Sequence, residues 1–156
     1  MYSPKADAGS EARLRTLRIL WALFLATVGL YALVAYLANP PSDAERARIQ
    51  GDPAPTGIPT VLVVFFALGV AAVVASFVLQ RAFAQKAAAR QRPDMFHQGL
   101  ILAFVFCEVA ALFGLMGLFV TGSRYAYALL ALGALAIALH FPRREQLLAA
   151  YFKPVG

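Results

Sequence analysis

One acidic residue, Glu108, interrupts a long apolar stretch of the sequence. It falls roughly 15 Å into a helix expected to begin at Gly99, which places its carboxyl group near the middle of a membrane. Such a group costs at least about 2.5–3.5 kcal/mol on insertion scales. Proton carriage, cation binding, or pairing with a basic group of a partner would offset that cost. The structural alternative is a neutral Glu108 that is hydrogen-bonded and holds helices together, with Ser76 as the expected partner.

The residues around Glu108 resemble the proton-binding hairpin of ATP synthase c subunits. As in that family, the acidic residue is followed by small residues, an aromatic residue and Gly-Leu, here over residues 108–115. Residues 89–94 resemble the cytoplasmic polar loop of the family, with Arg92 inserted into its Arg-Gln-Pro motif. The resemblance covers residues 60–121 and implies proton or cation binding at Glu108. As a whole, the chain resembles small four-helix bacterial membrane proteins.

Other side chains that could bind metals or act as nucleophiles are few and scattered. Cys107 is the only cysteine, which excludes an internal disulfide and a multi-cysteine metal site. His97 and His140 lie near the ends of two apolar segments without an acidic cluster, so a metal site there would lack ligands. A haem between the two histidines is an alternative, but we favour solvation at the membrane interface. We therefore predict no catalytic residue, no metal site and no cofactor.

Small residues gather on one broad face of the helix that carries Glu108. Such a face allows the backbone of another helix to approach closely, either within the chain or between protomers. The predicted helix-packing residues are Ala103, Cys107, Ala110, Gly114 and Gly117.

Four apolar runs have about the length needed to cross the hydrocarbon core of a bilayer. They cover residues 19–38, 59–79, 99–120 and 125–141. Prolines at the end of the first run and the start of the second, and Gly122 after the third, mark their limits. The sequence thus predicts an all-α integral membrane protein, a single domain over residues 1–156. We expect a four-transmembrane-helix up-down bundle.

Helical patterns also extend beyond these runs. Residues 10–18 predict a basic helical lead-in to the first run, and residues 80–92 predict an extension of the second. Residues 42–50 have the pattern of a short helix. A short amphipathic C-terminal helix over residues 143–152 is suited to the membrane surface. Asp94, beside Pro93, is the expected N-cap of the third apolar helix.

Composition and charge support the membrane interpretation. Of 156 residues, 61% are hydrophobic and 14% charged, against about 45–50% and about 25% in soluble domains. Eleven of the 14 Lys and Arg residues flank the runs on the side of the two termini. This asymmetry predicts cytoplasmic termini in a bacterial inner membrane. It does not indicate nucleic-acid binding.

These features predict a non-enzymatic integral membrane protein, a small structural or accessory subunit of a membrane assembly. Its expected partners are membrane lipid and either further copies of itself or a larger membrane complex. The alternative is a proton- or cation-handling, c-subunit-like protein that uses Glu108. A membrane enzyme is disfavoured because one isolated carboxyl group lacks an acid, base or metal partner.

Overall fold

The computed structural model describes residues 4–38, 50 and 58–142. In these residues the chain is helical and contains no strand, which confirms the all-α fold class. The predicted helix over 143–152 lies outside the described residues, as do residues 42–49 of the predicted short helix. The helices are α1 (Pro4–Ala38), α3 (Thr60–Arg90), α4 (Pro93–Thr121), the 3₁₀ helix η1 (Arg124–Ala126) and α5 (Tyr127–Leu139).

Three of these helices, α1, α3 and α4, are long and apolar enough to cross a membrane, judged by length and composition. The fourth α-helix, α5, is shorter than the helix predicted from the apolar run over 125–141. The 13 residues of α5 rise about 20 Å at 1.5 Å per residue, less than the thickness of a bilayer core. Gly122, with a φ of 63°, ends α4, and η1 then leads directly into α5.

The ends of the long helices depend on local backbone chemistry. Helix α1 includes the basic lead-in, and α3 continues to Arg90, where Gln91 takes a left-handed conformation with a φ of 51°. Helix α4 begins at Pro93, whose fixed φ and missing N–H suit the first helical position. The prediction that Asp94 is the N-cap is therefore wrong. Arg92 occupies the cap position, and Asp94 lies in the first turn.

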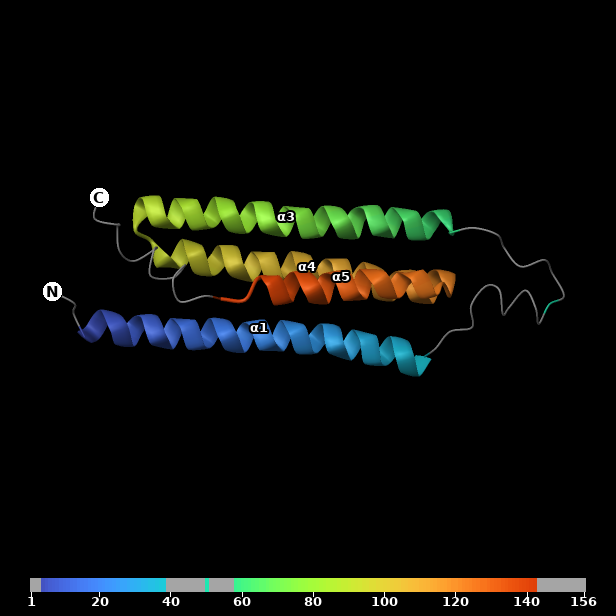
Figure 1. Ribbon diagram of the computed structural model, residues 1–156, viewed down its shortest axis with the longest axis horizontal. Coiled ribbons are helices and arrows are strands. Elements are labelled where there is room, and N and C mark those ends of the chain that lie inside the picture. The colour runs from blue at the N-terminus through green and yellow to red at the C-terminus, as the bar shows by residue number, and fades with distance from the viewer. Residues whose placement is uncertain (1–3, 39–49, 51–57, 143–156) are drawn as a thin grey trace.

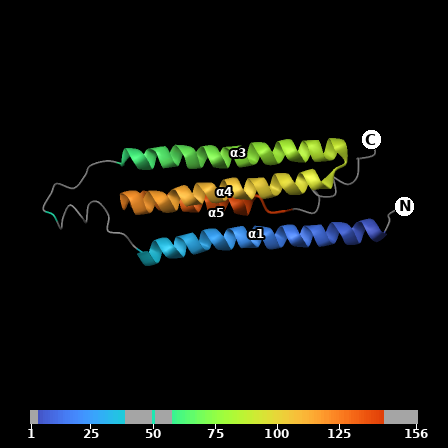
Figure 2. The same cartoon turned by 180° about the vertical axis from the view of Figure 1, so that it is seen from behind.

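The helices run alternately in opposite directions, and α4 and α5 separate α1 from α3 (Figures 1 and 2). Helix α4 packs against each of the other α-helices. Helix α1 packs against α4 and α5, whereas the main partner of α3 is α4. The first two long helices are thus not direct neighbours, although they follow each other in the chain.

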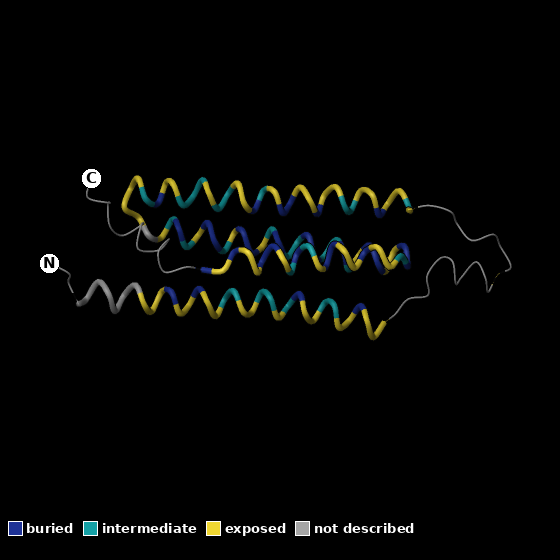
Figure 3. The backbone as a smooth tube through the Cα atoms, viewed as in Figure 1, coloured by how far each residue is buried: buried dark blue, intermediate teal, exposed yellow. Residues whose placement is uncertain are grey.

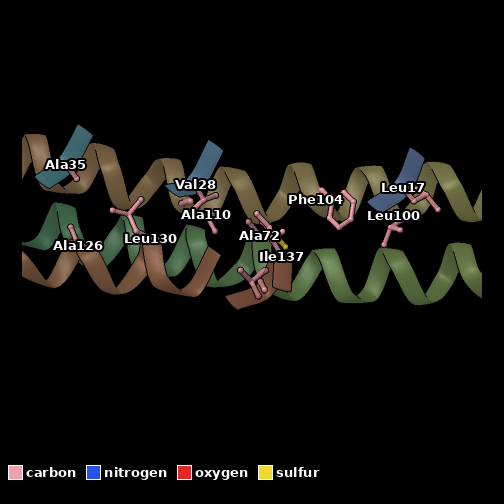
Figure 4. Close-up of a cluster of buried hydrophobic side chains, with 14 of the residues drawn as sticks. Leu17, Val28, Ala35, Ala72, Leu100, Phe104, Ala110, Ala126, Leu130 and Ile137 are labelled. Atoms are coloured by element: carbon pink, nitrogen blue, oxygen red, sulfur yellow. The ribbon is translucent and has the colours of Figure 1, made fainter. Parts of the chain in front are cut away.

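Burial follows from this arrangement, because α4 has neighbours on several sides while α1 and α3 each keep an outer side (Figure 3). The inner side of α1 contributes Leu17, Val28 and Ala35 to the buried cluster. In Figure 4 these three residues lie on one side of the labelled residues of α4 and α5. The buried cluster lies along α4 and is not concentrated at one end.

The predicted small-residue face of α4 is buried against α3, η1 and α5. A Cβ atom added to Gly114 would lie 2.8 Å from the Leu130 nitrogen, and one added to Gly133 would lie 2.8 Å from the Cys107 carbonyl oxygen. A Cβ atom added to Gly117 would meet Leu62 of α3 at 3.0 Å. All five residues of this face, Ala103, Cys107, Ala110, Gly114 and Gly117, are buried within the chain itself.

We predict that Gly114→Ala destabilises the protein and that Gly29→Ala does not. The new methyl group at Gly114 would overlap backbone and side-chain atoms of α5, whereas nothing lies within 4 Å of a Cβ atom at Gly29. Overpacking of this kind costs about 1–3 kcal/mol. Thermal unfolding of both variants in detergent micelles measures the difference. Equal transition temperatures would show that α4 and α5 do not pack this closely.

Candidate functional site

Glu108 lies in the middle of α4 and is half-buried between α4 and α1. Its Oε1 atom accepts a hydrogen bond from the Tyr31 hydroxyl of α1 at 2.9 Å. Its other carboxyl oxygen, Oε2, has no hydrogen-bond partner among the described residues. The candidate site is therefore a pair of side chains from two helices that lie 77 positions apart in the chain.

The expected pairing of Glu108 with Ser76 is wrong. The Ser76 hydroxyl donates to the Val73 carbonyl oxygen at 2.6 Å, and it accepts a hydrogen bond from the Cys107 thiol at 3.4 Å. Successive residues of an α-helix point about 100° apart. Cys107 consequently faces α3, and Glu108 faces α1.

Tyr31 lies in the C-terminal part of α1, and its hydroxyl group reaches Glu108 at the middle of α4. Side chains in a helix tilt toward its N-terminus, so the long tyrosine ring extends back from its Cα position. The last turns of α1 thereby supply a donor to a carboxyl group nearer the centre of the helix assembly.

The chemistry of this pair is limited to one donor and one carboxyl group. A phenol can donate to the carboxyl oxygen whether Glu108 is charged or neutral. A cation such as Ca²⁺ takes at least about six oxygen ligands. Within the described residues, no group of three or more His, Cys, Asp or Glu side chains could hold a metal ion. The geometry therefore favours a hydrogen-bonded carboxyl group that joins α1 to α4.

Three further polar contacts attach α1 along the same side. Arg13 forms an ion pair with Asp94 at 2.6 Å, and the Trp21 indole N–H donates to the Ile137 carbonyl oxygen at 2.9 Å. The Tyr127 hydroxyl donates to the Ala35 carbonyl oxygen at 3.2 Å. We call this row of contacts, made by Arg13, Trp21, Tyr31 and Ala35 of α1, the α1 seam.

Two contacts of the α1 seam use the carbonyl groups at helix ends. The last four carbonyl groups of an α-helix lack the partner that the helix itself would supply. Ala35 lies in the last turn of α1, and Ile137 lies in the last turn of α5, where its carbonyl oxygen also accepts from the His140 N–H at 3.1 Å. Sequence reasoning missed both contacts, although aromatic donors near the expected ends of apolar helices are a usable signal.

His140 is buried, so the interpretation of this residue as a solvated interfacial histidine is wrong. Its side chain is only 1% exposed, and its ring centroid lies 4.3 Å from that of Phe77. The Nδ1 atom lies 2.6 Å from the Ala136 carbonyl oxygen, which requires a proton on Nδ1. The Nε2 atom has no partner among the described residues. His97 lies in the first turns of α4 and is half-buried.

Comparisons of the chain with family models, with curated proteins and with solved structures found no match.

We predict that Tyr31→Phe lowers the free energy of unfolding by about 0.5–1.5 kcal/mol, because it removes the donor to Glu108. Glu108→Gln keeps an acceptor oxygen and should change stability by less than about 0.5 kcal/mol. Tyr36→Phe is the matched control, since Tyr36 is 73% exposed. Unfolding in detergent micelles provides the measurement. Indistinguishable Tyr31→Phe and Tyr36→Phe variants would show that the hydrogen bond contributes nothing.

Proposed function

We propose that this chain is a non-enzymatic integral membrane protein that acts as a small structural or accessory subunit of a membrane assembly. The observation that carries the proposal is the two-sided character of α1. Its inner side bears the polar contacts of the α1 seam, and its outer side is apolar and exposed. A helix fixed on one side and apolar on the other is suited to present a surface to lipid and to a partner helix.

The outer surfaces of both α1 and α3 support this proposal. In the most apolar 18-residue stretch of α1, only 11% of the residues are buried. The large hydrophobic residues exposed on these two helices include Leu23, Leu30, Leu37, Val64, Leu68 and Val78. Soluble monomers rarely expose contiguous apolar patches larger than a few hundred Å². Burial in a bilayer removes this surface from water.

The proposed location is a bacterial inner membrane with both termini in the cytoplasm, on the basis of the Lys and Arg asymmetry. In that orientation the end of α3 and the start of α4 also lie on the cytoplasmic side. The short α5 then enters from the opposite side and ends at the level of Trp21, whose indole bonds to Ile137. Its short length is compatible with a helix surrounded by longer ones.

The apolar outer side of α1 is the proposed surface for assembly, either with further copies of the chain or with a larger membrane complex. The small-residue face of α4 is filled by α3, η1 and α5, as the contacts at Gly114 and Gly117 require. A partner could reach that face only by displacing these elements. The outer side of α1 requires no such rearrangement.

A second candidate function, proton or cation handling at Glu108, has one specific observation in its favour. The carboxyl group is half-buried at the middle of α4, and α3 and α4 form a close antiparallel pair, as the c-subunit resemblance implies. The Tyr31 bond ties the same carboxyl group to α1. A carrier would have to release that bond in each cycle, which makes the structural role the better supported one.

The accessory-subunit proposal predicts a protein partner at the outer side of α1. A photoreactive residue at Leu30, which is exposed, should yield a discrete protein adduct in native membranes, and the same residue at Val78 of α3 is the control for non-specific lipid and protein labelling. Gel electrophoresis and mass spectrometry identify the adducts. Lipid adducts alone at both positions would contradict assembly through α1.

The two candidate functions give opposite predictions for Glu108→Gln. If Glu108 carries protons, a hydrophobic carbodiimide should label it less as the pH rises, because the neutral acid reacts, and Glu108→Gln should abolish proton flux into proteoliposomes. The structural role predicts equal flux for both proteins, at the level of empty liposomes. Flux that is present in the original chain and lost in Glu108→Gln would establish the carrier function instead.

A further inference from the structure

Two arginines on α1 stand apart from the ion pair that attaches this helix to α4. Arg13 is neutralised by Asp94. Arg15 and Arg18 form no ion pair with a described carboxylate, and both are exposed. They are three positions apart and therefore lie on the same side of the helix, about one turn from each other. The Glu11 carboxylate lies one turn before Arg15 on the same side, so the two guanidinium groups leave a net positive charge there, which can attract an anion.

The helix surface that continues from these arginines is apolar. Arg15, Arg18, Ile19 and Ala22 line one hollow, together with Glu11 and Leu14. Ile19 is 52% exposed, and Leu23, one turn further along, is 58% exposed. On this side of α1, the basic residues Arg15 and Arg18 are thus followed directly by an exposed apolar strip that contains Ile19, Ala22 and Leu23.

Arg18 has an additional contact that fixes the position of its guanidinium group along α1. Its guanidinium carbon lies 5.7 Å from the centroid of the Phe141 ring, within the range of a cation–π interaction. Phe141 itself stacks edge-on against Trp21 at 5.1 Å. This aromatic support holds the Arg18 charge beside the end of α5, at the border between the basic and the apolar parts of α1.

We propose that this surface binds one anionic phospholipid, with the phosphate on Arg15 and Arg18 and an acyl chain along Ile19, Ala22 and Leu23. The inference rests on the proposed membrane location. A guanidinium group binds phosphate oxygens with paired N–H donors, and the apolar strip below it matches a hydrocarbon chain. A free phosphate would satisfy the arginines but would leave the strip uncovered, which is why the lipid is the occupant.

Native mass spectrometry of the full chain, released from detergent micelles, tests the site with phosphatidylglycerol as the probe and phosphatidylcholine as the uncharged comparison. The original chain should retain one phosphatidylglycerol in preference to phosphatidylcholine. In the double variant Arg15→Gln/Arg18→Gln, retention should fall at least about tenfold, since each basic residue at an anionic surface contributes about a fivefold gain. Lys86→Gln/Arg90→Gln removes the same charge from the exposed end of α3 and should retain the lipid.

Equal losses in the two double variants would overturn the site, because general charge would then explain retention. Full competition by inorganic phosphate would also overturn it, since the ligand would then be the phosphate alone. Either result, with the Leu30 protein adduct still present, rejects the lipid site and leaves the proposed function standing. Recovery of the chain in the soluble fraction without detergent would instead reject the membrane location on which both depend.

Discussion

Helix α4 has to contact three other α-helices at once, and the structure depends on how its circumference is divided among them. Cys107 and Ala110 face α3, Ala111 meets Gly133 of α5, and Glu108 reaches Tyr31 of α1. Because adjacent residues differ by about 100° in direction, residues within the single stretch 107–111 can serve three neighbours. Small side chains are needed where a backbone approaches closely, and a long polar one suffices toward α1.

That division explains why α1 is attached differently from the other helices. Helices α3 and α5 meet α4 through close contacts at glycine and alanine, whereas α1 uses long side chains along the α1 seam. In the proposed membrane location, helix association would gain no hydrophobic driving force, so packing and hydrogen bonds between helices would decide it. Hydrogen bonds between transmembrane helices contribute about 0.6 kcal/mol each on average. Contacts spread from Arg13 to Ala35 of α1 therefore hold this helix more firmly than any single one.

The helical fold was predictable from the sequence because it follows from run length and from proline and glycine positions, which are local properties. The partner of Glu108 was not, because it depends on how α4 is rotated about its axis and on which helix stands beside each face. Ser76 and Tyr31 are equally polar in the sequence, and only the packing of Cys107 against α3 decides between them. The burial of His140 likewise depends on where α5 ends, at Leu139. The length of an apolar run in the sequence does not predict how many of its residues are helical.

The same rotation of α4 bears on what Glu108 can do. A carboxyl group that faced lipid or an open cleft would be free to exchange protons, whereas one that faces a phenol donor on a helix held elsewhere by Arg13 and Trp21 is confined. To release Glu108, the middle of α1 would have to move while contacts toward both of its ends persist. The hydrogen bond between Tyr31 and Glu108 thus links α1 to α4 at mid-helix, and in the proposed structural role this link sets the register of α1 and the orientation of its apolar outer side.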